Sequence, residues 1–242
     1  MKRAREWHPM TSLGMTMVVG VFTLTGLLGV PRPVFADDAQ DAQQLVDKAR
    51  LTFEAFIADK DMGPPLHSLL KRAKGVLVYP QILKGAFIIG ASGGSGVMLA
   101  HDQKAGKWGG PAFYTIGEAS FGLQVGGEAS EVVLVALSER GVAALLSTST
   151  KLGANAGVAL GPVGAGAEAA TANLSADIIS YSRAKGLYAG LSLDGAVVAT
   201  RGALNKAYYG KEVTPTDILI KRRVTNKHAA KLISAVAKAA GQ

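Results

Sequence analysis

Ser92 is the residue whose neighbours most resemble a catalytic motif. It lies at the centre of Gly90-Ala91-Ser92-Gly93-Gly94, and Asp217 and His228 follow in the chain order of a hydrolase triad. In such enzymes the serine occupies a sharp turn between a strand and a helix. Glycines and strand-forming residues follow Ser92, so no helix is expected to begin there. A serine hydrolase that uses Ser92 is therefore kept only as a remote alternative.

Other catalytic and cofactor chemistry has little support in the sequence. The chain contains no cysteine, which excludes disulfides, thiolate nucleophiles and cysteine-ligated metal centres. His67, His101 and His228 are widely separated, and no His-Glu-x-x-His motif occurs. The glycines between residues 90 and 96 lack the spacing of a dinucleotide motif, and no P-loop is present. We expect a protein that is not an enzyme and has no metal, no cofactor and no nucleic-acid partner.

Basic residues gather at several turns and helix ends, where they can meet an anionic bilayer. Each basic residue close to such a surface contributes about 1 kcal/mol to binding, and an exposed tryptophan prefers the membrane interface. A solvated loop or helix end is the alternative for each of them. The candidate lipid-binding residues are Lys71, Arg72, Lys74, Lys84, Lys107, Trp108, Arg183 and Lys185.

The first 36 residues have the pattern of an export signal. Basic residues come first, an apolar run follows from Leu13 to Val30, and Val34-Phe35-Ala36 precedes two aspartates. This order is typical of a secretory signal peptide. We expect cleavage after Ala36 and a periplasmic or secreted protein. A retained anchor is the alternative, since the apolar run has nearly the length of a spanning helix.

Helix patterns lie at both ends of the remaining chain. Residues 37–61 place apolar side chains three and four positions apart, which predicts a helix with one buried stripe. A membrane-surface helix is the alternative, and the acidic first turn weakens it. A short helix is expected over 65–74, and helical residues are also expected over 203–209 and 226–240.

The middle of the chain has strand patterns. Strands are expected over 76–79, ended by Pro80, and over 86–89, 97–101, 113–116, 121–125 and 132–137. Ser138 is expected to cap a helix through Leu146. The glycine-rich residues 153–170 are interpreted as two strands joined near Gly161, followed by a strand over 178–182, a turn over 183–186 and a return over 187–199.

Composition and element order together predict the fold class. The 242 residues include 30 glycines, are 48% hydrophobic and carry a net charge of +8, of which +5 lies beyond residue 36. Helices, then many short strands, then helices favour an α+β fold: a glycine-rich, mainly antiparallel twisted sheet or partial barrel flanked by N- and C-terminal helices. We expect a signal peptide over 1–36, one domain over 37–220 and a helical tail over 221–242.

A set of ordered sequence stretches resembles the SYLF family of lipid-binding domains. The stretches are AKGVLVYP (73–80), KGAFIIG (84–90), GSGVM (94–98), GKWGGPAFY (106–114), GEASFGLQVG (117–126), GPVG (161–164), ISYSRAKGLYAG (179–190) and NKAYYG (205–210). The resemblance implies binding to membrane lipid, and an actin-related role in the eukaryotic members. It supplies no catalytic residues.

Two non-enzymatic functions follow from these observations. The first is an extracytoplasmic module that binds anionic membrane lipid or a similar amphiphile. It rests on the resemblance, the export signal and the positive charge beyond residue 36, because a cationic surface attracts anionic partners. The second is a structural component of the cell envelope that binds an envelope protein.

Overall fold

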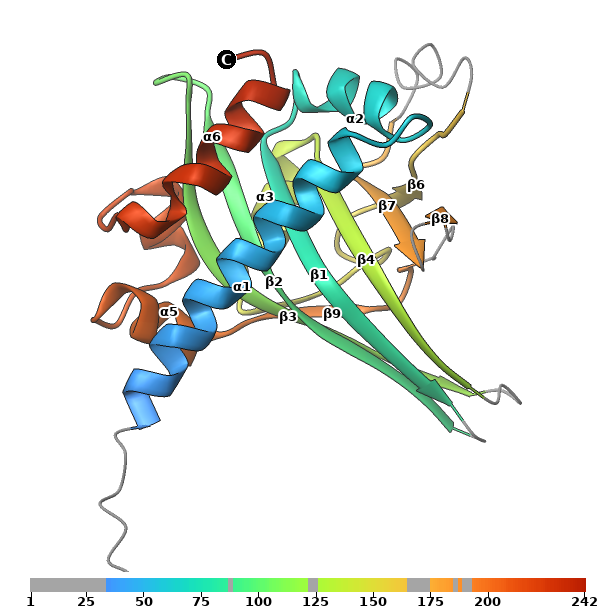
Figure 1. Cartoon of the computed structure of the whole chain (residues 1–242), viewed down its shortest axis with the longest axis horizontal. Helices are drawn as coiled ribbons and strands as arrows, with labels where there is room; N and C mark the ends of the chain where they lie inside the picture. Colours follow the sequence, from blue (N-terminus) through green and yellow to red (C-terminus); the bar gives the residue numbers. More distant parts are fainter. Residues whose placement is uncertain (1–33, 87–88, 122–125, 165–174, 185–186, 189–192) are drawn as a thin grey trace, which may run out of the picture. The chain divides into compact units, whose positions relative to one another are not determined.

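The computed structural model describes residues 34–86, 89–121, 126–164, 175–184, 187–188 and 193–242 (Figure 1). Its helices are α1 (Val34–Ile57), α2 (Gly63–Leu70), α3 (Glu139–Leu146), α5 (Gly202–Tyr209) and α6 (Ala230–Ala239), with short helical turns η1 (Thr216–Ile220) and η2 (Lys227–Ala229). Its strands are β1 (Gly75–Ala86), β2 (Ile89–Asp102), β3 (Lys107–Phe121), β4 (Gly126–Ala136), β5 (Ser149–Lys151), β6 (Val158–Leu160), β7 (Ile178–Ala184), β8 (Leu187–Tyr188) and β9 (Val197–Thr200).

The strands form one curled sheet whose two ends are close together in the chain. The order is β5-β9-β3-β2-β1-β4-β7-β6, and β8 pairs with β7. All pairings between these strands are antiparallel except that of β6 with β7. The terminal strands β5 and β6 are joined by residues 152–157, where Leu152 bridges to Ala156. The sheet is therefore a half-barrel, which confirms the predicted α+β class.

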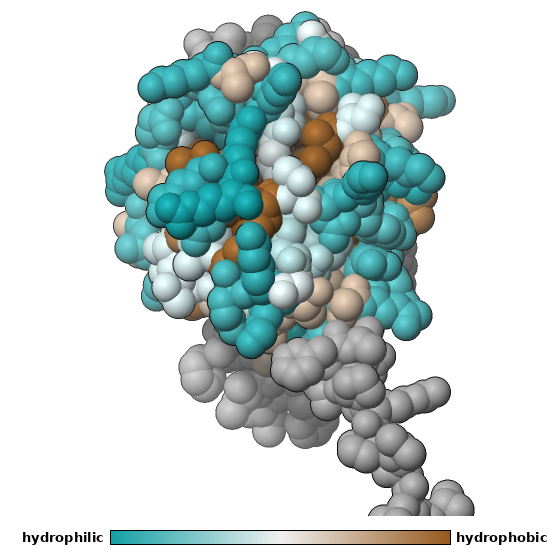
Figure 2. All heavy atoms as spheres, turned by 90° about the vertical axis from the view of Figure 1, so that its left-hand side faces the viewer, coloured by the Kyte–Doolittle hydropathy of each residue, from teal (hydrophilic) through white to brown (hydrophobic). Residues whose placement is uncertain are grey.

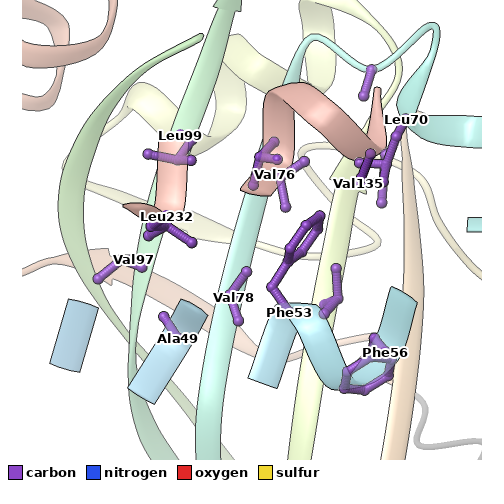
Figure 3. Packing of buried hydrophobic residues seen from close by; sticks show 14 of the residues in the cluster. Ala49, Phe53, Phe56, Leu70, Val76, Val78, Val97, Leu99, Val135 and Leu232 are labelled. Atoms are coloured by element: carbon purple, nitrogen blue, oxygen red, sulfur yellow. The ribbon is translucent and has the colours of Figure 1, made fainter. Parts of the chain in front are cut away.

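Helix α1 lies across one face of this sheet, beside α6 and α2 (Figure 1). Its residues Ala49, Phe53 and Phe56 are buried and meet strand side chains such as Val76 and Val135 (Figure 3). The buried positions of α1 recur every three or four residues, which places them on one side of a helix. The expectation of a helix with one buried stripe is confirmed.

The opposite face of the sheet has a second core. Alternate residues of β1 point to opposite faces, so Val76 and Val78 join the core under α1, while Leu77 and Tyr79 join the second core. Helix α3 and η1 cover this side with residues such as Leu145 and Leu219. Burial raises the pKa of Tyr79 and of Tyr114 in this core, because the ionised phenol loses its hydration.

Pro80 does not end its strand as predicted. Strand β1 continues to Ala86, and its register shifts at Pro80 against both β2 and β4. A β-bulge tolerates proline because the residue there does not need to donate an N–H group to the ladder. Of the strand expected over 86–89, Ala86 belongs to β1 and pairs with Gly90 of β2, and residues 87–88 lie outside the described residues.

Several other observed element boundaries differ from the predicted ones. Ser138 caps α3 as expected, because its hydroxyl oxygen accepts a hydrogen bond from the Gly141 N–H at 2.9 Å. The glycine-rich stretch contributes only β6 among the described residues, and residues 165–174 lie outside them. Residues 122–125 and 185–186, placed in a strand and a turn by the sequence, also lie outside. Residues 1–33 of the expected export signal lie outside as well, and α1 begins at Val34.

Asp177 joins α3 to the end of the sheet. Its carboxylate accepts hydrogen bonds from the hydroxyl of Ser138 and from the N–H of Gly157, the latter at 3.0 Å. These two contacts, the hydroxyl first, hold the pKa of Asp177 below its ordinary value, with a further contribution from Arg140. A carboxylate with a lowered folded pKa stabilises the fold above its unfolded pKa, and this stabilisation is lost as the pH falls.

We predict that Asp177→Asn flattens the acid limb of the stability curve. The wild type should lose stability as the pH falls from near the ordinary aspartate pKa of 3.8 to the lower folded value. The variant should be less stable at neutral pH and should lose less over that window, as measured by urea unfolding at stepped pH. Ser138→Ala should act in the same direction, and unchanged acid limbs in both variants would contradict this assignment.

We also predict that Gly96→Ala destabilises the half-barrel. A Cβ atom at Gly96 would lie 2.5 Å from Cδ1 of Tyr79 and 2.6 Å from the carbonyl oxygen of Val78. Overpacking of this kind costs about 1–3 kcal/mol. Gly202→Ala is the matched control, because nothing lies within 4 Å of a Cβ atom there. Chemical denaturation of both variants checks this, and equal midpoints would contradict the close packing of Tyr79 on β2.

Candidate functional site

A groove runs between α1, α2 and α6 on the helical side of the molecule. It has a volume of about 460 Å³. Its lining residues are Phe53, Glu54, Ile57, Ala58, His67, Ala235, Lys238 and Ala239. A second hollow of about 450 Å³ shares Glu54, Ala235 and Lys238 and extends the groove toward the start of α6. We call the two together the α1–α6 groove.

The sequence of α6 explains why space is left beside α1. Leu232 and Val236 anchor α6 in the core, whereas the positions that face the groove carry Ala235 and Ala239. Alanine fills much less volume than leucine or valine. Helices α1 and α6 therefore pack against each other near the core, and a space is left between them on the outer side. The floor is then formed by apolar atoms of Phe53 and Ile57.

The rim of the groove is polar and carries more positive than negative charge. Lys238 and Lys231 come from α6, and Arg50 pairs with Glu54 at 2.7 Å. His67 contributes an imidazole whose Nδ1 lies 3.0 Å from the Ala239 carbonyl oxygen. A carbonyl only accepts hydrogen bonds, so Nδ1 carries the proton and Nε2 is left as the second polar atom of the ring.

An apolar floor with a cationic rim suits a ligand that is itself amphipathic. Pockets for small organic ligands have volumes of roughly 300–1,000 Å³ and are mostly apolar with a few polar groups. The α1–α6 groove lies in that range. On the face that corresponds to the left-hand side of Figure 1, hydrophobic residues lie exposed between hydrophilic ones (Figure 2).

Four of the predicted basic residues belong to one end of the sheet. Lys71, Arg72 and Lys74 precede β1, whose first residue Gly75 pairs with Ala100 of β2, while Lys107 begins β3 and pairs with Asp102. The Nζ atom of Lys74 lies 3.3 Å from Gln103 in the β2–β3 turn and 2.5 Å from Glu139. We call these four residues the basic edge.

The turn between β2 and β3 contacts two residues of the basic edge, Lys74 and Lys107, and Asp102 orders this turn. The carboxylate of Asp102 accepts hydrogen bonds from the N–H groups of Ala105 and Lys104, which lower the pKa of Asp102, and Arg222 contributes further. The last residue, Gln242, contacts His101 in the same region at 2.8 Å. The C-terminal end of α6, and with it one end of the groove, therefore lies beside the basic edge.

Lys84, a candidate that is near Lys71 and Lys74 in sequence, does not belong to the basic edge. It pairs with Ser92 and Glu128 far along β1. Ten residues of extended strand separate it from Lys74, and this corresponds to roughly 33 Å. Lys185 lies outside the described residues.

The side chain of Arg183 lies under α1 and contacts other residues of the protein. Its side chain is 16% exposed, it forms an ion pair with Glu131, and its guanidinium lies 5.0 Å from the ring centroid of Phe56. Thr52 of α1 donates a hydrogen bond to the same Glu131 at 3.0 Å. The arrangement ties α1 to β4 and β7, which is a structural task that the sequence did not indicate.

The expectation that Trp108 is exposed is wrong. Only 6% of the residue is accessible, and it packs in the core under the helices. Its ring lies 5.2 Å from that of His101. Alternation along β3 explains the error, because Lys107 faces solvent and the next side chain must face the opposite side of the strand.

Ser92 does not have the geometry of a hydrolase nucleophile. It lies inside β2 and pairs with Lys84 on one side and Glu118 on the other, so no strand-to-helix turn exists there. His228 is occupied by Asp47 at 3.2 Å and by the carbonyl oxygen of Gln43 at 3.1 Å. In the described part of the chain, no group of three or more histidine, aspartate or glutamate side chains has metal-binding geometry.

The groove residues were missed by sequence reasoning. Lys238 and Lys231 lie in a segment that was identified only as helical, and His67 was interpreted as an isolated histidine. The available signal was the alternation of alanine with lysine in α6, which leaves small residues on the side that faces α1. Among the described helices, none is both long and apolar enough to cross a membrane.

Fold and site together define a half-barrel domain with an amphipathic groove between the helices that cover it. Comparison with known families identifies the family of this domain. Residues 117–239 match the Ysc84 family, described as "Las17-binding protein actin regulator". The chain belongs to this family, whose domain is the SYLF domain of the resemblance stated above.

Named relatives agree with this assignment. Protein YSC84 of Saccharomyces cerevisiae is 36% identical over 174 residues, which is 70% of this chain and 36% of that protein. LAS seventeen-binding protein 3 of the same species is 33% identical over 197 residues, 80% of this chain and 42% of that protein. The human SH3 domain-containing YSC84-like protein 1 is 34% identical over 157 residues, which is 64% of this chain and 45% of that protein. The match spans less than half the length of each relative.

We predict that Arg183→Gln lowers stability and leaves vesicle binding unchanged. The substitution leaves Glu131 partly buried without its ion pair, and an unpaired charge of this kind costs about 1–3 kcal/mol. A double-mutant cycle with Glu131→Gln, measured by urea unfolding, should show coupling between the two residues. Loss of vesicle binding at full stability would instead support the original lipid-binding prediction for Arg183.

Proposed function

We propose that this protein is a non-enzymatic lipid-binding module that takes an anionic amphiphile into the α1–α6 groove. The observation that carries the proposal is the groove itself, which combines an apolar floor at Phe53 and Ile57 with cations at Lys231 and Lys238. The apolar part of a ligand gains about 25 cal/mol for each Å² that it removes from water. The rim cations would then hold the charged end of the ligand at the surface.

The basic edge supports the same proposal from a different direction. It lies beside one end of the groove, so a bilayer that met Lys71, Arg72 and Lys107 would bring its lipids close to the groove opening. Membership of the SYLF family, and the lipid binding which the resemblance implies, agree with this arrangement.

The proposed location is outside the cytoplasm, in the periplasm or secreted. This part of the proposal rests on the residue pattern of positions 1–36, with cleavage after Ala36. N-terminal sequencing of the exported protein tests it, and a mature protein that begins at Met1 would contradict it.

A protein partner is the second candidate function. The family description names binding to Las17, and one relative is named as a LAS seventeen-binding protein. Here the partner would be an envelope protein. Crosslinking in the native envelope, followed by identification of the linked protein, tests this candidate, and crosslinked products that contain no protein partner would contradict it.

We predict that two groove variants reduce amphiphile binding by different routes. Ala235→Trp should fill the groove, and Lys238→Glu should repel an anionic head group while the floor stays open. Native mass spectrometry of the full chain should show retained amphiphile in the wild type and roughly tenfold less in each variant, about 1.4 kcal/mol of binding energy. Co-sedimentation with anionic vesicles at low salt should fall in parallel, because salt screens exposed charges.

Lys227→Glu is the matched control for charge. Lys227 is exposed in η2, just before α6, and does not line the groove, so the variant has the same net charge as Lys238→Glu. It should bind as the wild type does. Equal loss in both charge variants would show that binding follows net charge alone and would reject the groove as the site.

A further inference from the structure

A small pocket lies between the first half of α1, β2 and the start of α5. Its volume is about 190 Å³. Its lining residues are Asp41, Gln44, Leu45, Lys48, Ser95, Arg201 and Leu204. None of them lines the α1–α6 groove, so this is a separate site, which we call the Arg201 pocket.

Arg201 has an unusual environment for a partly buried cation. Its Nη1 atom donates a hydrogen bond to Ser95 Oγ at 2.7 Å, and in the described part of the chain it forms no ion pair. A guanidinium has five N–H donors in a fixed plane, and the bond to Ser95 accounts for one of them among the described residues. The Ser95 oxygen accepts this bond, which leaves the Ser95 hydroxyl proton available for another acceptor.

The charges around Arg201 increase its need for an anion. Helix α5 begins at the next residue, Gly202, and its first turn has no side-chain cap. The exposed N–H groups of a helix start carry a partial positive charge, which disfavours a cation beside them. Lys48 adds a second positive charge on the opposite wall and also forms no ion pair among the described residues.

Asp41 adds one negative charge to the α1 wall, which also carries Lys48. It lies one turn before Gln44 and Leu45 on the same helix, and its carboxylate forms no ion pair with Lys48 or Arg201. The pocket thus keeps two cations and one anion apart across a space where a ligand fits. A simple anion satisfies the cations and is repelled by Asp41, whereas a ligand with both charges satisfies all three.

We propose that the Arg201 pocket binds a phosphate ester that carries a primary amine close to the phosphate, as in the phosphoethanolamine group. The phosphate oxygens accept hydrogen bonds from Arg201 and Ser95 and pair with Lys48, while the ammonium pairs with Asp41. Planar guanidinium donors match phosphate oxygens well. With about 190 Å³, the pocket has less than half the volume of the hollow beside Phe53 and suits a small polar group.

The test uses the full chain and O-phosphoethanolamine as the probe, followed by phosphorus NMR and isothermal titration calorimetry. Saturable binding is expected, and inorganic phosphate and ethanolamine should each bind at least roughly tenfold more weakly, since each lacks one half of the recognised charge pattern. Equal binding of inorganic phosphate and O-phosphoethanolamine would overturn the assignment of the amine to Asp41.

Three variants separate the contributions of the three charged residues of the pocket. Lys48→Gln and Arg201→Gln should each weaken O-phosphoethanolamine binding by roughly tenfold or more, as expected for a lost charge-assisted hydrogen bond. Asp41→Asn should weaken O-phosphoethanolamine but strengthen inorganic phosphate. Lys211→Gln, on an exposed residue outside the pocket, is the control for net charge. Lys48 is itself exposed, so its variant tests the site even where Arg201→Gln affects folding.

The origin of the phosphoamine is resolved by a competition arm. Vesicles that contain phosphatidylethanolamine should displace O-phosphoethanolamine if the group is a lipid head group, whereas phosphatidylcholine vesicles should not. Displacement by neither, with binding of the free compound intact, identifies a soluble phosphoamine. Because the probe is soluble and the variants lie outside the α1–α6 groove, this result is independent of the groove experiments. Binding that is unchanged in both cation variants would reject the pocket.

Discussion

The packing of α1 on the sheet is the interaction on which both candidate sites depend. One stripe of the helix, with Val46, Phe53 and Phe56, is buried against β1, β2 and β4. That contact leaves two flanks of the same helix free to meet other elements. Arg50, Glu54 and Ile57 meet α6, whereas Asp41, Gln44 and Lys48 face β2 and α5. Without the buried stripe, neither the groove nor the Arg201 pocket has a wall.

Polar contacts fix the angle at which α1 lies. Burial of an apolar stripe is not directional, so it permits the helix to slide or roll over the strands. Contacts of Glu131 with Thr52 and Arg183 remove this freedom at one point. They also place the Arg183 guanidinium against the ring of Phe56. At the other end His228 contacts Asp47 and Gln43. These polar groups define where the groove opens, although none of them lines it.

The sequence predicted what periodicity and composition govern and missed what depends on contacts between distant residues. The stripe of α1, the Ser138 cap and the buried run of β4 follow from local spacing. The bulge at Pro80 does not, because only pairing with two neighbouring strands lets β1 continue through a residue without an N–H group. Trp108 was placed in solvent because its neighbours are lysines, whereas the alternation of β3 buries it. Neither pocket was predicted, since Lys48 and Arg201, like Phe53 and Lys238, are far apart in sequence.

The two sites lie on opposite flanks of α1, and this decides how they relate to each other. At 3.6 residues per turn, positions 41, 44, 45 and 48 cluster on one side of the buried stripe and positions 50, 54, 57 and 58 on the other. A ligand in the groove therefore has the full width of the helix between it and the Arg201 pocket, so one molecule does not occupy both. Any influence of one ligand on the other must pass through a movement of α1 as a unit, and by linkage it must be equal in both directions. Since α1 is held by its stripe in the core under the helices and by the Glu131 and His228 contacts, we expect the two sites to bind their ligands independently.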